Sequence, residues 1–95
     1  MHKFGFIGMG NMASAIAQGF VESGFIPGGQ VCAYDLNKAQ LDKMSTFGIK
    51  AKNNAHEVVS ESEIIFLCVK PQVIESVVSE VREDLKNKAV VSIVL

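Results

Sequence analysis

Apolar residues along this chain follow two alternating patterns: short continuous runs, and longer segments in which they recur every third or fourth position. The continuous runs predict strands of a parallel sheet, because such strands are covered on both faces. The segments with wider spacing predict helices that bury one face. Strands are therefore expected at 4–7, 30–34, 49–51, 63–69 and 89–95, and helices at 11–23, at 37–47, from residue 54 and from residue 71.

Residues at the helix ends support this assignment. Gly24 and Gly48 suit the position just after a helix, and Pro71 suits a first helical turn. Asn54, with Glu57 three residues later, resembles a capping box. The expected buried faces are Met12, Ala15, Ile16, Gly19 and Phe20 in the first helix; Leu41, Met44 and Phe47 in the second; and Ile74, Val77, Val78, Val81 and Leu85 in the last.

The regular alternation of strand and helix predicts the fold class. Right-handed crossovers between parallel strands place helices on both faces of the sheet. We therefore expect an α/β fold, a Rossmann-type doubly wound parallel sheet in three αβα layers, with residues 1–95 forming a single domain.

Composition and charge exclude several partners. The formal net charge is −1 and no cluster of Lys or Arg is present, so we expect neither nucleic acid nor membrane as a partner. Cys32 and Cys68 fall in expected buried strands without metal-ligand spacing, which favours reduced core thiols. Gly5, Gly8 and Gly10 interrupt the first apolar run, so it predicts neither a signal segment nor a membrane span, and we expect a cytoplasmic location.

A glycine-rich turn follows the first expected strand. Residues 4–13 read Phe-Gly-Phe-Ile-Gly-Met-Gly-Asn-Met-Ala, a Gly-x-Gly-x-x-Ala pattern between a strand and a helix. Gly8 allows a sharp turn, Gly10 leaves room for a pyrophosphate, and Ala13 lets the helix approach the sheet. The free amides of the helix start would then face the anion. This context predicts a dinucleotide-binding site, whereas an ordinary tight turn would not need both glycines.

Asp35 ends the second expected strand, where a carboxylate can accept hydrogen bonds from the adenosine ribose and repel a 2′-phosphate. Taken alone, it favours NAD over NADP. Two alternatives stay open: Asp35 caps the helix that begins near Asn37, or it is simply solvated. Because Asn37 and Lys38 could serve a 2′-phosphate, the preference between NADH and NADPH also stays open.

The remaining polar residues predict little chemistry. Lys70 stands at the carboxyl end of the fourth strand, where open α/β sheets bind ligands, although contact through the backbone of residues 69–71 is the simpler interpretation. His56 has no second ligand or carboxylate partner at a recognisable spacing. No nucleophile with a base, carboxylate pair or metal set is evident, so we expect no catalytic residue and no metal site, and the chemistry would belong to the cofactor.

Two segments carry a resemblance to a known family: Gly5-Phe-Ile-Gly-Met-Gly-Asn-Met-Ala-Ser-Ala-Ile16, and Ile64-Ile-Phe-Leu-Cys-Val-Lys-Pro-Gln72 followed by Val90-Val-Ser-Ile93. Over essentially its whole length the chain resembles the N-terminal domain of pyrroline-5-carboxylate reductase. That resemblance implies hydride transfer from NAD(P)H to the imine carbon of 1-pyrroline-5-carboxylate, giving L-proline, the last step of proline biosynthesis.

The resemblance also implies roles for particular residues. The pyrophosphate would lie along Ile7, Gly8, Met9, Gly10, Asn11 and Met12; the ribose beside Asp35 and Asn37; and the nicotinamide end beside Cys68, Val69, Lys70 and Pro71. An Asn before the third helix often contributes in the family, and Asn54 lies one position out of register with it. Asp35 departs from the small or basic residues often found at its position. The final residues, Ser-Ile-Val-Leu in place of Ser-Ile-Ala-Ala-Gly, would put bulkier side chains beside the cofactor.

The chain ends at Leu95 inside an expected strand, so we expect a fragment of a longer protein. In the resembled family a C-terminal helical domain holds the substrate and makes the dimer, which implies a homo-oligomer and a fragment that binds dinucleotide without turnover. Two alternatives remain: a β-hydroxyacid-dehydrogenase-like oxidoreductase and a non-catalytic dinucleotide-binding module.

Overall fold

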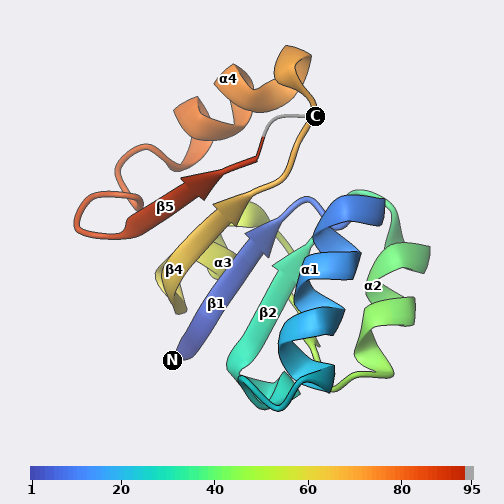
Figure 1. Ribbon diagram of the computed structural model, residues 1–95. Coiled ribbons are helices and arrows are strands. Elements are labelled where there is room, and N and C mark those ends of the chain that lie inside the picture. Colours follow the sequence, from blue (N-terminus) through green and yellow to red (C-terminus); the bar gives the residue numbers. More distant parts are fainter. Residues whose placement is uncertain (94–95) are drawn as a thin grey trace.

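The computed structural model describes residues 1–93 and contains five strands and four α-helices (Figure 1). In chain order the elements are β1 (His2–Ile7), α1 (Asn11–Glu22), a 3₁₀ turn η1 (Gly28–Gln30), β2 (Val31–Tyr34), α2 (Lys38–Ser45), β3 (Lys50–Ala51), α3 (Ala55–Ser60), β4 (Ser62–Leu67), α4 (Pro71–Val81) and β5 (Ala89–Ser92). The alternation expected from the sequence is confirmed: the boundaries agree to within two residues, except that β5 ends at Ser92. The last two residues of the fifth expected strand, 94 and 95, lie outside the described part.

All strands run parallel, in the order β3-β2-β1-β4-β5. Helices α1 and α2 cover one face of the sheet, and α3 and α4 cover the other (Figure 1). The strand order reverses between β1 and β4, where the chain crosses from one face to the other. This reversal opens a crevice at the carboxyl ends of the strands, which is where doubly wound sheets bind ligands. The three-layer Rossmann-type fold is therefore confirmed.

Each face of the sheet has its own core. On the α1–α2 face, Phe4 and Phe6 both contact Phe66, with ring centroids 5.5 and 4.7 Å apart. On the α3–α4 face, Val58 and Val59 of α3 are fully buried with Ile65 of β4. Gly5 permits the close approach of α3, because a Cβ there would lie 2.7 Å from a methyl group of the Val58 side chain.

The buried face of α1 differs from the expected one. Ala13, Ser14 and Ala17 are the buried residues, whereas Met12, Ala15 and Gly19 are exposed and Ile16 and Phe20 are half-buried. The expectation was right for Ile16 and Phe20, which pack against the core, and wrong for Met12, Ala15 and Gly19. The buried stripe is turned by one residue and includes Ala13 and Ala17, because the spacing of apolar residues does not distinguish a stripe from its neighbour.

The carboxyl-terminal elements are less buried than expected. Val81 is the one fully buried residue of α4, while Ile74, Val77, Val78 and Leu85 of the expected face are half-buried. All residues of β5 are exposed, so the expectation of a strand covered on both faces is wrong for the described part of β5. Within residues 1–93, no helix combines the length and the apolar character needed to cross a membrane.

Candidate functional site

Gly8 is the point at which the chain leaves β1. Its φ of +97° is a left-handed conformation that favours glycine, and its N–H donates to Tyr34 O at 2.9 Å. A Cβ at Gly8 would lie 2.3 Å from the carbonyl oxygen of Cys68. Gly8 is therefore required both for the turn and for the close approach of the segment after β4.

Gly10 has a different role. It is the N-cap of α1, has an ordinary φ of −71°, and no side chain caps the helix. A Cβ at Gly10 would meet nothing within 4 Å, so the protein itself does not require glycine there. The uncapped amides at the start of α1 and the open space beside Gly10 suit a phosphate group. The residues present thus fit the pyrophosphate of a dinucleotide.

Met9, between the two glycines, is already engaged. Its side chain is fully buried, its N–H donates to Asp35 Oδ2 at 2.6 Å, and its carbonyl accepts from the Ser14 hydroxyl at 3.1 Å. The buried side chain and these two hydrogen bonds anchor the turn between β1 and α1 to the rest of the protein. Its expected contact with the pyrophosphate stays a prediction.

Asp35 and Asn37 form the turn after β2. Asp35 Oδ1 accepts from the Asn37 N–H at 2.7 Å, and Asn37 Oδ1 accepts from the Ala39 N–H at 3.0 Å. Asn37 is therefore the N-cap of α2, and the hypothesis that Asp35 caps this helix is wrong. The half-buried carboxylate of Asp35 instead links the turn after β2 to the glycine turn after β1, through its bonds to Asn37 and Met9.

Two hollows meet at the end of β2 and share Tyr34, Asp35 and Leu36. The first, which we call the β2–β3 hollow, has a volume of about 480 Å³ and also includes Lys38, Leu41, Asp42, Ala51, Lys52 and Asn53. The second, the β1–α4 hollow, has a volume of about 350 Å³ and also includes Ile7, Gly8, Asn54, Ala55, Val69, Val73, Ser76, Val77 and Glu80. Together they form a crevice that runs past the glycine turn.

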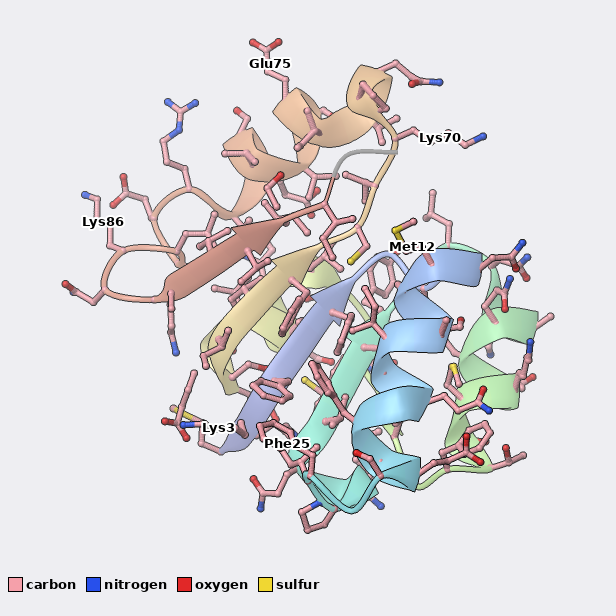
Figure 2. The ribbon with its side chains drawn as sticks, in the orientation of Figure 1. Lys3, Met12, Phe25, Lys70, Glu75 and Lys86 are labelled. Atoms are coloured by element: carbon pink, nitrogen blue, oxygen red, sulfur yellow. The ribbon has the colours of Figure 1, made fainter. Side chains whose placement is uncertain are left out.

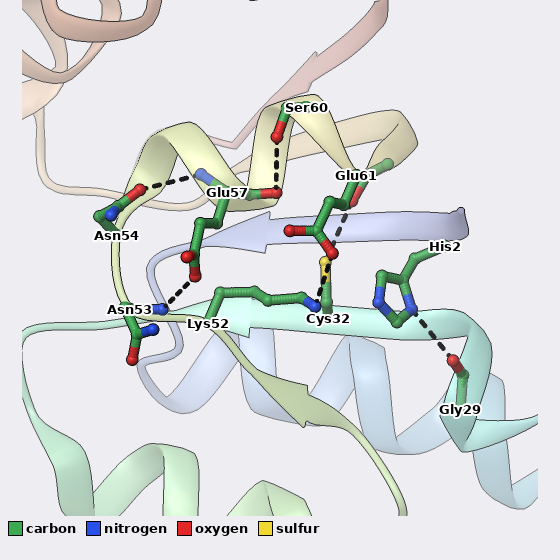
Figure 3. Close-up of polar contacts among 10 residues, drawn as sticks. His2, Gly29, Cys32, Lys52, Asn53, Asn54, Glu57, Ser60 and Glu61 are labelled. Atoms are coloured by element: carbon green, nitrogen blue, oxygen red, sulfur yellow. Dashed lines mark hydrogen bonds and ion pairs between the residues drawn. The ribbon is translucent and has the colours of Figure 1, made fainter.

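Local hydrogen bonds hold the approach to α3 (Figure 3). Asn54 Oδ1 accepts from the Glu57 N–H at 2.9 Å, and Glu57 Oε1 accepts from the Asn53 N–H at 2.8 Å. The expected N-cap is confirmed, although the Glu57 side chain reaches Asn53 rather than Asn54. Beside it, Lys52 donates to Glu61 at 2.9 Å, which raises the pKa of Lys52 and lowers the pKa of Glu61. These bonds place Asn54 at the wall of the β1–α4 hollow.

The segment after β4, residues 68–71, lies on the other side of the glycine turn and forms part of the wall of the crevice. The Cys68 N–H donates to Ile7 O at 2.9 Å, and burial raises the pKa of the Cys68 thiol to about 11. Val69 faces the β1–α4 hollow, whereas Lys70 and Pro71 are exposed. Lys70 extends from the same end of the sheet as Met12 (Figure 2). The expectation that Cys68 lies within a strand is corrected, because β4 ends at Leu67.

Some residues of the crevice were not expected from the sequence. Leu36 is 90% exposed, and an apolar side chain directly after Asp35 in a polar turn could have been noticed. Val73, Ser76 and Val77 of α4 carried no signal beyond their helical spacing. His56 was expected to lack a carboxylate partner, but its Nδ1 is hydrogen-bonded to Asp84 and its Nε2 lies 4.0 Å from Glu80. Glu80 lies on α4 and Asp84 in the turn that follows it, 28 residues after His56, a pairing that sequence spacing does not reveal.

Metal ligands do not gather in the described region: residues 1–93 contain no group of three or more His, Cys, Asp or Glu side chains placed to hold an ion. The glycine turn, the uncapped start of α1 and the crevice at the strand reversal define an NAD(P)-binding domain of the Rossmann type.

The chain belongs to the family described as coenzyme F420-dependent NADP oxidoreductases, whose sequence model matches residues 3–95. It is 42% identical over 93 residues to a pyrroline-5-carboxylate reductase of Arabidopsis thaliana, a match covering 96% of this chain and 34% of that protein. It is 41% identical over 93 residues to the pyrroline-5-carboxylate reductase of Escherichia coli, covering 96% of this chain and 35% of that protein. The chain thus spans about a third of the length of these relatives and corresponds to their N-terminal NADP-binding domain.

Solved structures agree with this placement. A pyrroline-5-carboxylate reductase from Coxiella burnetii superposes with a TM-score of 0.90 at 26% identity, covering 99% of this chain and 36% of that one. The Plasmodium falciparum pyrroline carboxylate reductase, whose structure has NADP bound, gives a TM-score of 0.85 at 27% identity, covering 98% of this chain and 33% of that one.

Proposed function

We propose that this chain is the NAD(P)H-binding domain of an enzyme that reduces 1-pyrroline-5-carboxylate to L-proline. The identity of 41–42% to pyrroline-5-carboxylate reductases over nearly the whole chain is the observation that carries the proposal. The site supports it, because the glycine turn and the crevice fit a dinucleotide. The reaction itself stays a proposal, since about two thirds of each relative has no counterpart here.

The cofactor would lie along the carboxyl ends of β1, β2 and β4. We assign the pyrophosphate to the turn and the start of α1, the ribose to Asp35 and Asn37, and the wall of the crevice to Asn54 and Val69. The full proposed set is Ile7, Gly8, Met9, Gly10, Asn11, Met12, Asp35, Asn37, Asn54, Cys68, Val69, Lys70 and Pro71.

When bound, NAD(P)H would supply the hydride that reduces the imine carbon. The chain's own contribution is to bind and orient. The amides at the start of α1 would hold the anionic centre of the cofactor, and the turn at Gly8 orients these amides. We assign no catalytic residue within 1–95, so the groups that hold the substrate would come from a C-terminal domain.

Three further points belong to this proposal. We propose that residues 1–95 form one domain of a longer protein, and that the C-terminal domain makes a homo-oligomer, as the resemblance implies. We propose a cytoplasmic location, supported by two buried free thiols, Cys32 and Cys68, which suit a reducing compartment. Light scattering and cell fractionation of the full-length protein test these points.

The decisive experiment follows NADH and NADPH oxidation at 340 nm by the full-length protein on adding 1-pyrroline-5-carboxylate. A panel of β-ketoacids is run in parallel, and the product is identified as L-proline. Oxidation driven by the imine is the expected result, and the two rates give the cofactor preference. Oxidation driven only by ketoacids would indicate a β-hydroxyacid-dehydrogenase-like enzyme, and dinucleotide binding without any turnover would indicate a binding module.

A further inference from the structure

The hydrogen-bond ladder between β1 and β2 continues past the end of the sheet through a side chain. Its last backbone rung is the bond from the Gly8 N–H to Tyr34 O at 2.9 Å. At the next residue the chain turns out of the sheet, and the Met9 N–H donates to the Asp35 carboxylate at 2.6 Å. A short bond to a charged acceptor is stronger than a backbone rung. Asp35 therefore fixes the peptide between the two glycines.

The same carboxylate also organises the turn after β2. Its other oxygen accepts from the Asn37 N–H at 2.7 Å, and Asn37 in turn caps α2 through the Ala39 N–H at 3.0 Å. One continuous set of bonds thus runs from the glycine turn to the start of α2. The bond from Asp35 to Met9 spans 26 residues of sequence, so it joins two elements that local structure alone would leave independent.

We infer that Asp35 is a positioning residue for the pyrophosphate-binding turn, in addition to any contact it makes with the ribose. This inference rests on the proposed function only in naming the ligand, an NAD(P)-type dinucleotide. By holding the Met9 N–H, Asp35 sets the orientation of the Gly8–Met9 peptide. The Ser14 hydroxyl holds the Met9 carbonyl, so the two bonds together fix Met9 where the chain enters α1. The two roles are compatible, because each carboxylate oxygen can accept more than one hydrogen bond.

The two roles predict different ligand profiles. A carboxylate that only contacts the ribose would affect NADH and NADPH in opposite directions. A carboxylate that positions the turn acts on the pyrophosphate, which all these ligands share. The diagnostic probe is NADH whose adenosine ribose is 2′,3′-dideoxy, because it keeps the pyrophosphate and lacks both hydroxyls that Asp35 could contact.

The test measures dissociation constants by calorimetry for D35N, which keeps the side chain's size and removes its charge and one acceptor oxygen. We expect about tenfold weaker binding of the dideoxy probe, the loss typical of a charged hydrogen bond. NADH should weaken by at least as much, and NADPH by less, because D35N also removes a charge that repels the 2′-phosphate. The control is E63Q, which removes a carboxylate charge near the amino end of β4, where Glu63 is paired with Lys3 and lines neither hollow; it is expected to leave dideoxy-NADH binding unchanged. Unchanged dideoxy-NADH binding in D35N would overturn the inference.

A second readout needs neither ligand nor activity. Hydrogen–deuterium exchange of a peptide covering residues 8–13 is measured in the ligand-free full-length protein, with circular dichroism confirming the fold. The Met9 amide is expected to exchange at least about tenfold faster in D35N than in E63Q, because it loses its charged acceptor. Equal exchange in both variants would also overturn the inference. Because this readout is independent of imine reduction, it separates a failure of the inference from a failure of the proposed function.

Discussion

One row of residues across the sheet shows how differently its two sides are built. Four residues lie side by side in register across the sheet: Ala33 of β2, Phe6 of β1, Phe66 of β4 and Val91 of β5. Their exposed fractions are 0%, 0%, 9% and 41%. The first three belong to the core beneath α1 and α2, and the fourth is outside that core. The side that carries the glycine turn is thus a completed core, whereas the described β5 side is open.

This difference has a functional meaning. The turn that would hold the pyrophosphate is bonded on both flanks, through Gly8 to β2 and through Ile7 to Cys68 after β4. Its geometry is therefore set by the best-packed part of the sheet. The wall of the β1–α4 hollow is formed in part by α4, where Val73 is 41% exposed. The expected anion site rests on well-packed strands, whereas one wall of the β1–α4 hollow rests on a helix with a single fully buried residue.

The largest expected effect tests this contrast directly. Phe6→Ala removes a fully buried ring and is expected to destabilise the protein by about 4 kcal/mol, the usual cost of such a cavity. Val91→Ala, in the same row, should cost less than about 1 kcal/mol because its side chain is already half-exposed. Urea unfolding of both variants gives the two values. Similar losses would mean that β5 is as well covered in the full-length protein as β1.

A second pair of substitutions asks whether the glycine turn belongs to the core. Gly8→Ala should cost roughly 3 kcal/mol, because it adds a Cβ to a residue at φ +97° and pushes it against the Cys68 carbonyl. Gly19→Ala is the matched control, in an exposed part of α1 where a Cβ meets nothing within 4 Å. That change should stabilise the protein by up to about 1 kcal/mol. A Gly8→Ala variant of unchanged stability would show that the turn can relax.

Gly10→Val separates ligand binding from folding. A Cβ at Gly10 has open space around it, so thermal stability should hardly change. The valine side chain would occupy the expected pyrophosphate position, and we expect NADH and NADPH to bind at least about 100-fold more weakly. Calorimetry and a melting curve on one sample measure both effects. Unchanged affinity for both cofactors would place the pyrophosphate elsewhere.

The sequence predicted the roles of Gly8 and Gly10 better than it predicted which side chains around them are buried or bonded. Strand runs, helix spacing and the Gly-x-Gly-x-x-Ala context are local signals, and the structure follows them. The buried face of α1 was only partly right: Ile16 and Phe20 pack against the core as expected, but Ala13 and Ala17 are buried in place of Ala15 and Gly19, a rotation of the helix that apolar spacing alone does not fix. The bond between Asp35 and Met9 could not be read from sequence, because it depends on how two turns meet in space.

A substitution at Asp35 is expected to change the preference between NADPH and NADH by a smaller factor than Gly10→Val changes the affinity. Asp35→Ser removes a negative charge beside the expected ribose position, so the ratio of NADPH to NADH affinity should rise about tenfold. Absolute affinity for both should fall, because the bond to the Met9 amide is also lost. Titration of both cofactors against the variant and the parent protein gives the ratio. An unaltered ratio would mean that the carboxylate faces away from the ribose and acts only on the turn.

The smallest effect compares two buried thiols on opposite faces of the sheet. Burial raises the pKa of Cys68 from 9.0 to about 11, so the folded state favours the neutral thiol. That contribution to stability is complete below pH 9.0 and is lost as pH rises towards 11. By pH 10 the loss amounts to roughly 1 kcal/mol. Burial also raises the pKa of Cys32, but a hydrogen bond with Ser62 opposes the shift.

Cys68→Ala should therefore flatten the fall in unfolding free energy between pH 9 and 11 more than Cys32→Ala does. Urea unfolding of the parent and both variants across this range measures the slopes, with pH 7 values correcting for the cavity that each alanine leaves. An equal slope in the parent and Cys68→Ala would mean that this thiol titrates normally. In that case water reaches the segment after β4, and the buried flank of the glycine turn is less tightly closed than the β1 side of the sheet suggests.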